Sequence, residues 1–144
     1  MASNSQFAVA IHILAMLSLK KDAPMTSEYM GGSVNTNPVF IRRILGLLSR
    51  AGLVVSQSGV GGGWRLLRAP EAITLLDVYL AVDEGHLLAH SHSEPNPECL
   101  VGRNIQRTLK HYFSEAELAF EQSLARHTIA DVLATIGEDP HMRL

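Results

Sequence analysis

A capping residue followed by proline, Asn37-Pro38, fixes the start of a helix in the first half of the chain. Asparagine accepts hydrogen bonds from the free N–H groups of a helix start, and proline suits the first helical position, where its missing N–H costs nothing. Apolar residues then recur at helical spacing as far as Leu48. Ala51-Gly52 follows, and glycine favours the left-handed conformation that ends helices. These signals predict a helix over about residues 38–50.

A glycine-rich hairpin is predicted directly after this helix. Leu53–Ser56 reads as one strand and Trp64–Leu67 as the return strand, joined by a turn over Ser58–Gly63. The glycines do not predict a nucleotide-binding loop, because such a loop leads into a helix and usually ends in lysine followed by serine or threonine. Here a strand without lysine follows.

Helical periodicity predicts further helices on both sides of this unit. A short helix is expected after Met25 with Thr26 or Ser27 as its cap, and Gly31-Gly32 makes it dependent on tertiary packing. The other expected helices span Asn4–Leu19, Ile73–Val82 with Thr74 as cap, Val101–His127 and Ile129–Ile136, and His86–Pro97 is expected to be a polar loop.

Helix, short helix, longer helix and glycine-tipped hairpin, in this order, define a winged helix-turn-helix. We expect a mainly α fold with a small β-hairpin wing, divided into a DNA-binding domain (1–83), a sensor-type loop (84–100) and a long dimerisation helix with a C-terminal helix (101–144). The fold suits DNA because a helix fits the major groove and glycines let the backbone approach the duplex closely. The candidate DNA-binding residues are Thr26, Ser27, Asn35, Thr36, Asn37, Val39, Arg42, Arg43, Arg50, Gly61, Gly62 and Arg65.

Two adjacent arginines, Arg42 and Arg43, lie within the third helix and project about 100° apart. One can reach the groove and the other a phosphate or an acidic neighbour. Taken singly, each arginine is explained equally well by a solvated helix face or a salt bridge, because phosphate contacts are generic. The arginines therefore support DNA binding only together with the motif around them.

Charge is divided unevenly along the chain. Residues 1–68 contain seven Lys and Arg against two Asp and Glu, a net charge of +5, whereas residues 69–144 contain five against twelve, a net charge of −7. A basic half is expected to face a polyanion and an acidic half to face solvent or a partner protein. Scattered surface charge is the simpler alternative, so charge alone does not decide between them.

Composition narrows the class of protein. At 144 residues, 47% of them hydrophobic, the chain is long enough for one domain with a core. No apolar run is long enough for a membrane span, and the N-terminus lacks the pattern of a secretory signal, so we expect no membrane partner. One cysteine, Cys99, fits a reducing compartment and a cytoplasmic location. No nucleophile–base pair or carboxylate dyad stands in a recognisable frame, so we do not expect an enzyme.

The predicted long helix is a candidate dimer interface. About 27 residues span roughly 40 Å, more than a domain of this size easily covers by itself. An apolar stripe that only completes a monomeric core is the alternative to pairing with a symmetry mate. A homodimer would read a pseudo-palindromic DNA site. The stripe consists of Ile105, Leu109, Tyr112, Ala116 and Phe120.

Four segments together resemble the Rrf2 family of bacterial transcription regulators. They are Asn37–Leu45 (NPVFIRRIL), Ala51–Val54 (AGLV), Gly61–Trp64 (GGGW) and Ile73–Val78 (ITLLDV). The resemblance runs from Phe7 through the long helix. It implies a homodimer held by the long helix, recognition by the third helix and a wing on the adjacent minor groove.

The resemblance also bears on cofactors. Iron–sulfur members of the family carry three cysteines in the loop before the long helix, whereas this chain has only Cys99, which matches the third. Ser93 stands where a second cysteine is expected, and Gln6 lies near the position where some members have an acidic ligand. Clusters are held chiefly by thiolates. The chain is therefore more similar to the subgroup with a single loop cysteine, and no cofactor is expected.

Three interpretations of Cys99 remain open at this point. It is a redox-sensing thiol if the start of the long helix lowers its pKa. It is a metal ligand if it joins His86, His90 and His92, although their spacing matches no standard zinc motif. It is otherwise a cysteine without a role.

The sequence thus predicts a dimeric DNA-binding repressor that responds to redox or thiol chemistry through Cys99. One alternative is a protein-interaction module that uses the winged helix without binding DNA, since a fold does not fix a function. The other is a metal-responsive regulator that uses the histidine-rich loop.

Overall fold

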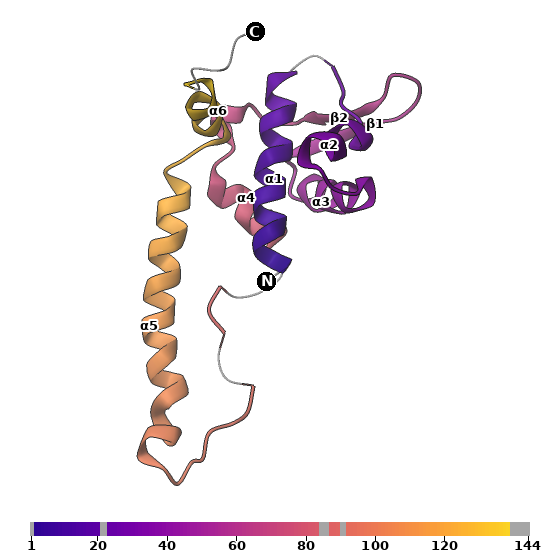
Figure 1. Cartoon of the computed structure of the whole chain (residues 1–144). Helices are drawn as coiled ribbons and strands as arrows, with labels where there is room; N and C mark the ends of the chain where they lie inside the picture. Colours follow the sequence, from indigo (N-terminus) through magenta and orange to yellow (C-terminus); the bar gives the residue numbers. More distant parts are fainter. Residues whose placement is uncertain (1, 21–22, 84–86, 90–91, 139–144) are drawn as a thin grey trace.

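Six α-helices, a short 3₁₀ helix and a two-stranded hairpin make up the described part of the chain (Figure 1). The structure, a computed structural model, describes residues 2–20, 23–83, 87–89 and 92–138. The helices are α1 (Ala2–Leu19), α2 (Ser27–Val34), α3 (Pro38–Arg50), α4 (Leu75–Val82), α5 (Leu100–Ala125) and α6 (Ile129–Gly137). The hairpin consists of β1 (Val54–Gln57) and β2 (Gly63–Leu66), and η1 (Pro70–Ala72) follows it. The mainly helical fold with a small hairpin confirms the prediction.

The hydrophobic core lies among α1, α2, α3 and α4. α3 contributes one complete face to it, because its apolar residues recur every three to four positions. Burying one such side chain contributes about 1.5–3 kcal/mol, so the core fixes the orientation of α3. The fully buried side chains of these four helices include Ile13, Leu14, Met30, Ile41, Ile44, Leu45, Leu48 and Val78.

Local hydrogen bonds set the turn between α2 and α3. Thr26 caps α2, accepting from the Tyr29 N–H at 3.2 Å. Asn35 takes the left-handed conformation that ends α2, with φ at 61°. Asn37 then caps α3, accepting from the Val39 N–H at 2.8 Å, as the Asn37-Pro38 pair predicts. Each helix end thus has its cap in the sequence beside it.

Gly31, in the middle of α2, is closely packed against the turn into α3. A Cβ at this position would lie 3.0 Å from the Thr36 carbonyl oxygen and close to the Pro38 ring. The Thr36 N–H also donates to the Gly31 carbonyl at 3.0 Å. The turn into α3 therefore packs directly on the backbone of α2, which is the tertiary support that the glycines require.

The hairpin pairs β1 and β2 antiparallel, from Val54 opposite Leu66 to Gln57 opposite Gly63. Both strands begin one residue away from the predicted positions. Leu53 is excluded because its N–H donates to the Leu48 carbonyl at the end of α3. Gly63 is included at the other strand, where a Cβ would lie 2.7 Å from the Met25 carbonyl oxygen.

A short backbone pairing closes the C-terminal part of the chain onto the domain. The Leu75 N–H donates to the His127 carbonyl and the Ile129 N–H donates to the Ile73 carbonyl, both at 2.9 Å. This pairing brings together the N-termini of α4 and α6, which carry matching capping boxes, Thr74 with Asp77 and Thr128 with Asp131. Ile129 is completely buried beneath it. η1, which the sequence reading did not predict, lies against α6.

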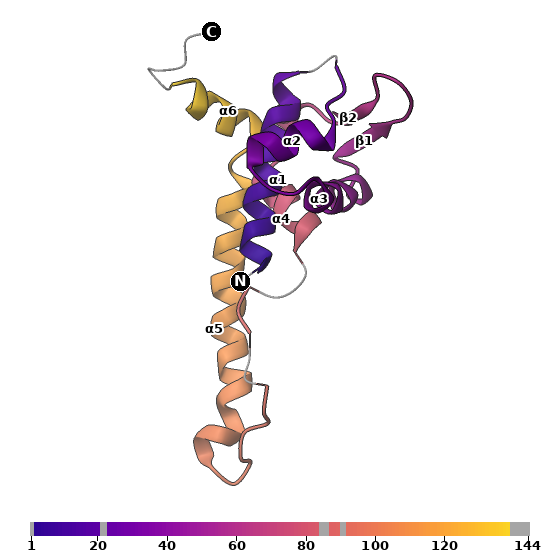
Figure 2. The ribbon, with the colours of Figure 1, turned by 45° about the vertical axis from the view of Figure 1, so that its right-hand side comes forward.

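α5 extends well beyond the rest of the molecule (Figures 1 and 2). It runs from Leu100 to Ala125, slightly shorter than the predicted Val101–His127, because His127 turns to pair with Leu75. Its C-terminal half lies beside α4, and its N-terminal half projects away from the domain. No residue of α5 is buried within the chain.

The domain boundaries at residues 83 and 100 stay a prediction. Among the described residues, α6 of the C-terminal part contacts α1 of the predicted DNA-binding domain. Among the residues that the structure describes, no helix is both long and apolar enough to cross a membrane.

Candidate nucleic-acid interface

The outer face of α3 is the central surface of the candidate interface. Ile41, Ile44 and Leu48 turn into the core. At 100° per residue, the opposite direction is taken by Val39, Arg43 and Arg50, all of which are exposed. The packing of the core therefore leaves this face of α3 on the surface, from its first turn to its last.

Polar residues gather at the leading end of this face. Asn35 and Asn37 are exposed and Thr36 is half-buried in the turn that enters α3. Together with Gly31, Gly32 and Glu28 they line a shallow, open hollow. Val39 follows on the first turn of α3 with 62% of its surface exposed. Exposed amides and one methyl-bearing side chain at a helix start match what base edges in a major groove offer.

Arg42 lies on the flank of α3 that faces α2. Its Nη1 lies 3.2 Å from Glu28 Oε1 and donates to Ser27 Oγ at 3.3 Å. Arg42 thus has an acidic neighbour, one of the two kinds of partner expected for this pair of arginines. Both charged side chains of the pair are about half exposed or more, so the pair contributes at most about 1 kcal/mol.

Two candidate DNA contacts on α2 have roles inside the protein. Thr26 caps α2 with its hydroxyl. Ser27 is buried and accepts the hydrogen bond from Arg42. Their assignment to DNA stays a prediction, whereas their contribution to orienting α2 and Arg42 is visible in the structure.

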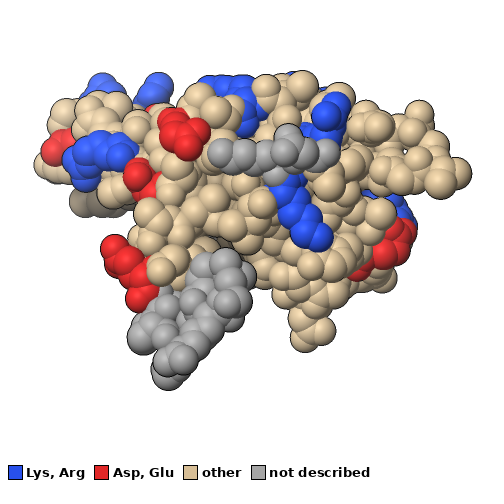
Figure 3. Space-filling model, turned by 90° about the horizontal axis from the view of Figure 1, so that it is seen from above, with Lys and Arg blue, Asp and Glu red and all other residues tan. Residues whose placement is uncertain are grey.

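The hairpin tip forms the wing, and it is uncharged. Gly59 and Gly61 have φ of 94° and 76°, which L side chains rarely adopt. Gly62 has no room for a Cβ, which would overlap the Gln57 carbonyl oxygen. Val60, between these glycines, is fully exposed. Figure 3 shows this end of the molecule, at the right, without charged side chains.

Arg65 is the charged candidate nearest the wing. It is exposed on β2, opposite Val55 in the hairpin. The other basic residues in this view lie over the middle of the molecule and at its left side, opposite the wing (Figure 3). Positive charge therefore borders the wing rather than reaching its tip.

Cys99 occupies the N-cap position of α5, at the far end of that helix, and is exposed. The backbone N–H groups of Gly102 and Val101 stabilise the thiolate and lower the pKa of Cys99 below its ordinary value. The loop is held against this helix start, where the Cys99 N–H donates to the Asn96 carbonyl at 3.3 Å. Exposure and a lowered pKa are the two properties that a reactive thiol needs.

Cys99 and His92, the two candidate metal ligands that the structure describes, do not make up a metal centre by themselves. His92 is exposed in the loop that precedes Cys99, while His86 and His90 lie outside the described residues. Among the residues that the structure describes, no three His, Cys, Asp or Glu side chains gather in a group that could hold a metal ion. One exposed thiol per chain is also too few for an iron–sulfur cluster, which needs four protein ligands, mostly thiolates.

The apolar stripe predicted for dimerisation divides into two parts. Ile105 and Leu109 are half-buried and Tyr112 is exposed in the N-terminal half of α5, which projects from the domain, and Ala116 is exposed in the C-terminal half. Phe120 instead packs within the chain, edge to face against Tyr79, with ring centroids 5.1 Å apart. The sequence pattern does not distinguish the face of α5 that packs on the domain from the predicted dimerisation stripe, because the two faces are adjacent around the helix.

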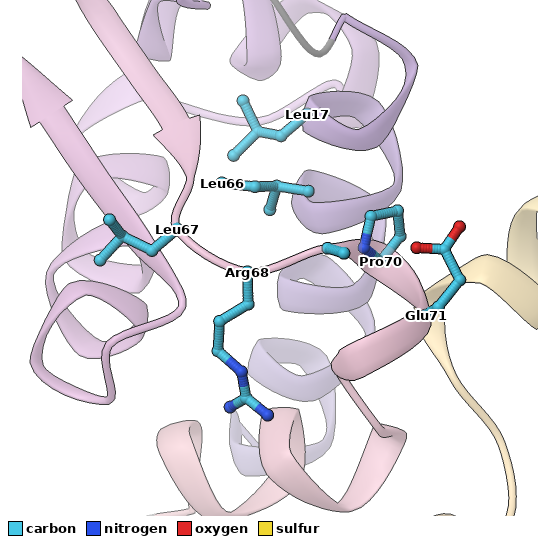
Figure 4. Close-up of a pocket in the computed structure, with 7 residues that line it drawn as sticks. Leu17, Leu66, Leu67, Arg68, Pro70 and Glu71 are labelled. Atoms are coloured by element: carbon cyan, nitrogen blue, oxygen red, sulfur yellow. The ribbon is translucent and has the colours of Figure 1, made fainter.

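A pocket of about 260 Å³ lies apart from this surface, between α1, the end of β2 and η1. Leu17, Leu66 and Pro70 line its apolar side, and Arg68 points away from Leu17 and Leu66 (Figure 4). The Arg68 guanidinium donates to the Ala72 carbonyl at 2.6 Å and lies 3.6 Å from Asp77. Arg68 therefore links the segment after β2 to η1 and α4.

A helix-turn-helix with a glycine-tipped wing and an exposed recognition face defines a winged-helix DNA-binding protein. The Rrf2 family, described as iron-dependent transcriptional regulators, matches residues 3–135. The chain is 43% identical to YwnA of Bacillus subtilis strain 168, an inferred HTH-type transcriptional regulator, over 90% of this chain and 96% of that protein. This chain therefore belongs to the Rrf2 family of DNA-binding transcription regulators, as the sequence motifs indicate.

Solved structures share the fold. The crystal structure of an inferred DNA-binding protein is 38% identical and superposes with a TM-score of 0.73, over 89% of this chain and 98% of that one. IscR of T. potens superposes with a TM-score of 0.69 at 19% identity, over 96% of this chain and 90% of IscR. The similarity to IscR establishes the fold alone. The family description mentions iron, but the described residues of this chain include no group of His, Cys, Asp or Glu side chains that could bind it.

Proposed function

We propose that this regulator is a homodimeric repressor that places α3 of each protomer in a major groove and the wing along the adjacent minor groove. The observation that carries the proposal is the exposed outer face of α3, with Asn35, Asn37 and Val39 at its leading end. In a helix-turn-helix, these positions contact base edges while flanking arginines contact phosphates. Arg42 and Arg43 follow on the second turn of α3, and Arg50 lies at its C-terminal end.

Dimerisation is supported by α5. Tyr112 has 61% of its surface exposed and Val101 has 65%, on a helix without any buried residue. Large apolar side chains on a projecting helix are stabilised when they pack against the same helix of a second protomer. Such a two-fold dimer presents two copies of α3 to half-sites about 34 Å, or one turn of DNA, apart.

Signal reception at Cys99 is the second part of the proposal. Its thiolate attacks a peroxide oxygen, the O–O bond breaks, hydroxide leaves and Cys99 becomes a sulfenic acid. A second Cys99 thiol, from the other protomer, then displaces water to give a disulfide between the protomers. The exposure of Cys99 and its lowered pKa support this chemistry. We propose that the protein senses without a resident metal or iron–sulfur cluster.

Fluorescence anisotropy of the reduced protein on DNA from upstream of its own gene tests the proposal. We expect sequence-selective binding that weakens steeply with salt, because several phosphates are neutralised. Mild peroxide should change the affinity of the wild-type protein and leave the Cys99→Ser variant unaffected.

Each result separates the parts of the proposal. Selective binding that ignores peroxide would remove Cys99 from the mechanism and leave DNA recognition in place. Weak binding that does not depend on sequence or salt would favour the protein-interaction module instead.

A further inference from the structure

The tip of the wing carries one apolar side chain and no charge. Between Ser58 and Trp64, Val60 is the only residue that is not glycine, and no charged residue lies between Arg50 and Arg65. Val60 is also fully exposed. The wing therefore ends in a branched aliphatic side chain whose neighbours along the chain have no side chains.

Backbone hydrogen bonds hold this tip in one shape. The Gly62 N–H donates to the Gly59 carbonyl at 3.0 Å and closes the turn around Val60. At the base of the hairpin, Met25 and Trp64 exchange two backbone hydrogen bonds, at 3.0 and 2.9 Å, which tie β2 to the segment before α2. A side chain presented from a turn that is already ordered loses little further freedom when it binds a ligand.

The tip lies on the same side of the domain as the recognition helix. Figures 1 and 2 both show the wing and α3 on the side of α1 that faces away from α5. In the function proposed above, on which this inference rests, α3 occupies a major groove and the wing follows the adjacent minor groove. The tip of the wing then meets the floor and walls of that minor groove.

A minor groove suits this tip by its width and by its chemistry. The groove is about 6 Å wide, so a slender backbone with a single side chain enters it more easily than a broad tip. Apolar side chains are inserted into minor grooves by other DNA-binding proteins. On the floor of the groove, a G·C pair carries the N2 amino group of guanine, which an A·T pair lacks. A valine side chain over that amino group would leave a buried donor without a partner.

We propose that Val60 is a specificity-determining residue, whose side chain fills the minor groove over A·T pairs and is excluded from G·C pairs by the guanine amino group. This contact buries apolar surface and neutralises no phosphate. It therefore adds affinity and selectivity without adding to the salt dependence of binding.

Base replacement in the operator tests the inference directly. Inosine lacks only the N2 amino group of guanine, so an I·C pair presents the major groove of G·C and the minor groove of A·T. Each A·T pair in and beside the half-sites is replaced by G·C and by I·C, and the affinity of the reduced protein is measured by anisotropy. At a pair that Val60 contacts, we expect G·C to weaken binding about tenfold and I·C to change it little. At a pair that α3 contacts in the major groove, both replacements should weaken binding alike.

Three variants assign the effect to a residue. Val60→Ala removes the two methyl groups and should bind the unmodified operator about tenfold more weakly, with the wild-type salt slope and without the difference between G·C and I·C. Val39→Ala makes the same replacement at an exposed valine of α3, and should leave that difference intact. Val60→Lys should raise the salt slope by about 1.8, one phosphate for each protomer.

Three results would overturn the inference. One is a wild-type protein that binds G·C and I·C operators equally at every pair. Another is a Val60→Ala protein that still separates them, because the backbone of the wing or the shape of the groove would then detect the amino group. The third is an unchanged salt slope in Val60→Lys, which would place the tip away from the DNA. Failure of the proposed function is recognised separately, because the wild-type protein would then bind no operator selectively, or no pair would respond alike to G·C and I·C.

Discussion

The ring of Tyr79 stands edge to face between two others, with its centroid 5.1 Å from that of Phe120 and 5.4 Å from that of Phe7. These three rings join α4, α5 and α1. Burial raises the pKa of the Tyr79 hydroxyl above its ordinary value of 10.0, and the carboxylates of Asp83 and of two glutamates on α5 raise it further. The contact that fixes α5 to the domain therefore favours a neutral tyrosine.

Tyr79→Phe should change stability only at alkaline pH. A phenol whose pKa is raised in the folded state ionises more readily in the unfolded chain, so the wild-type fold loses stability as the pH rises from about 10 through the folded-state pKa, and a phenylalanine does not. The variant keeps the ring contacts and should match the wild type at pH 7 to within about 0.5 kcal/mol. Urea unfolding at pH 7 and between pH 9 and 11 measures the difference. An identical decline of both proteins above pH 10 would contradict this assignment.

Leu109→Glu should separate the protomers. A carboxylate at a half-buried position of the α5 stripe would be desolvated in a paired interface, at a cost of several kcal/mol. Sedimentation at micromolar concentration should show a monomer, and circular dichroism should show unchanged helical content. Gln122→Glu adds the same charge to an exposed position of α5 and should remain dimeric. A dimeric Leu109→Glu protein would place the interface elsewhere.

The pair of Arg42 and Glu28 gives opposite predictions for its two members. Arg42→Ala should weaken DNA binding and lower the salt slope by about 1.8 per dimer, because a phosphate contact is lost in each protomer. Glu28→Gln should strengthen binding about threefold, since Arg42 no longer has a competing carboxylate. The melting temperature should change little in either variant, because the pair is exposed. Anisotropy titrations check both, and normal operator binding by Arg42→Ala would remove this residue from the interface.

Cys99 should react with alkylating reagents at lower pH than an ordinary cysteine does. The N–H groups of Gly102 and Val101 stabilise the thiolate in the folded chain, so the midpoint of the rate–pH profile should fall below 9.0. The same protein in urea loses the helix start and supplies the ordinary profile. Coincident profiles for folded and unfolded protein would show that the cap does not activate the thiol.

Local signals made the DNA-binding half predictable. The caps Thr26, Asn37 and Thr74 and the start at Pro38 act within a few residues along the chain, so the sequence pattern locates α2, α3 and α4 closely. η1 was missed because Pro70 is equally compatible with a loop. The strands shifted by one residue because the end of α3 uses the N–H of Leu53.

Contacts between distant residues could not be predicted in the same way. Nothing near Leu75 in the sequence indicates that it pairs with His127, and the division of α5 into a domain side and a stripe depends on where α4 lies. Phe120 accordingly carries an intrachain contact beside its predicted place in the stripe. The DNA-contacting, sensing and dimerising roles of the candidate residues stay predictions.

α5 meets the domain through its C-terminal half, and Cys99 stands at its opposite end. The 26 residues of α5 span about 39 Å at 1.5 Å per residue. A tilt of about 5° near the contact between Phe120 and Tyr79 therefore moves the Cys99 end by about 3 Å, the length of a hydrogen bond. As in any lever, the converse also holds: a small force at Cys99 produces a torque at α4 that equals the force multiplied by the length of the arm.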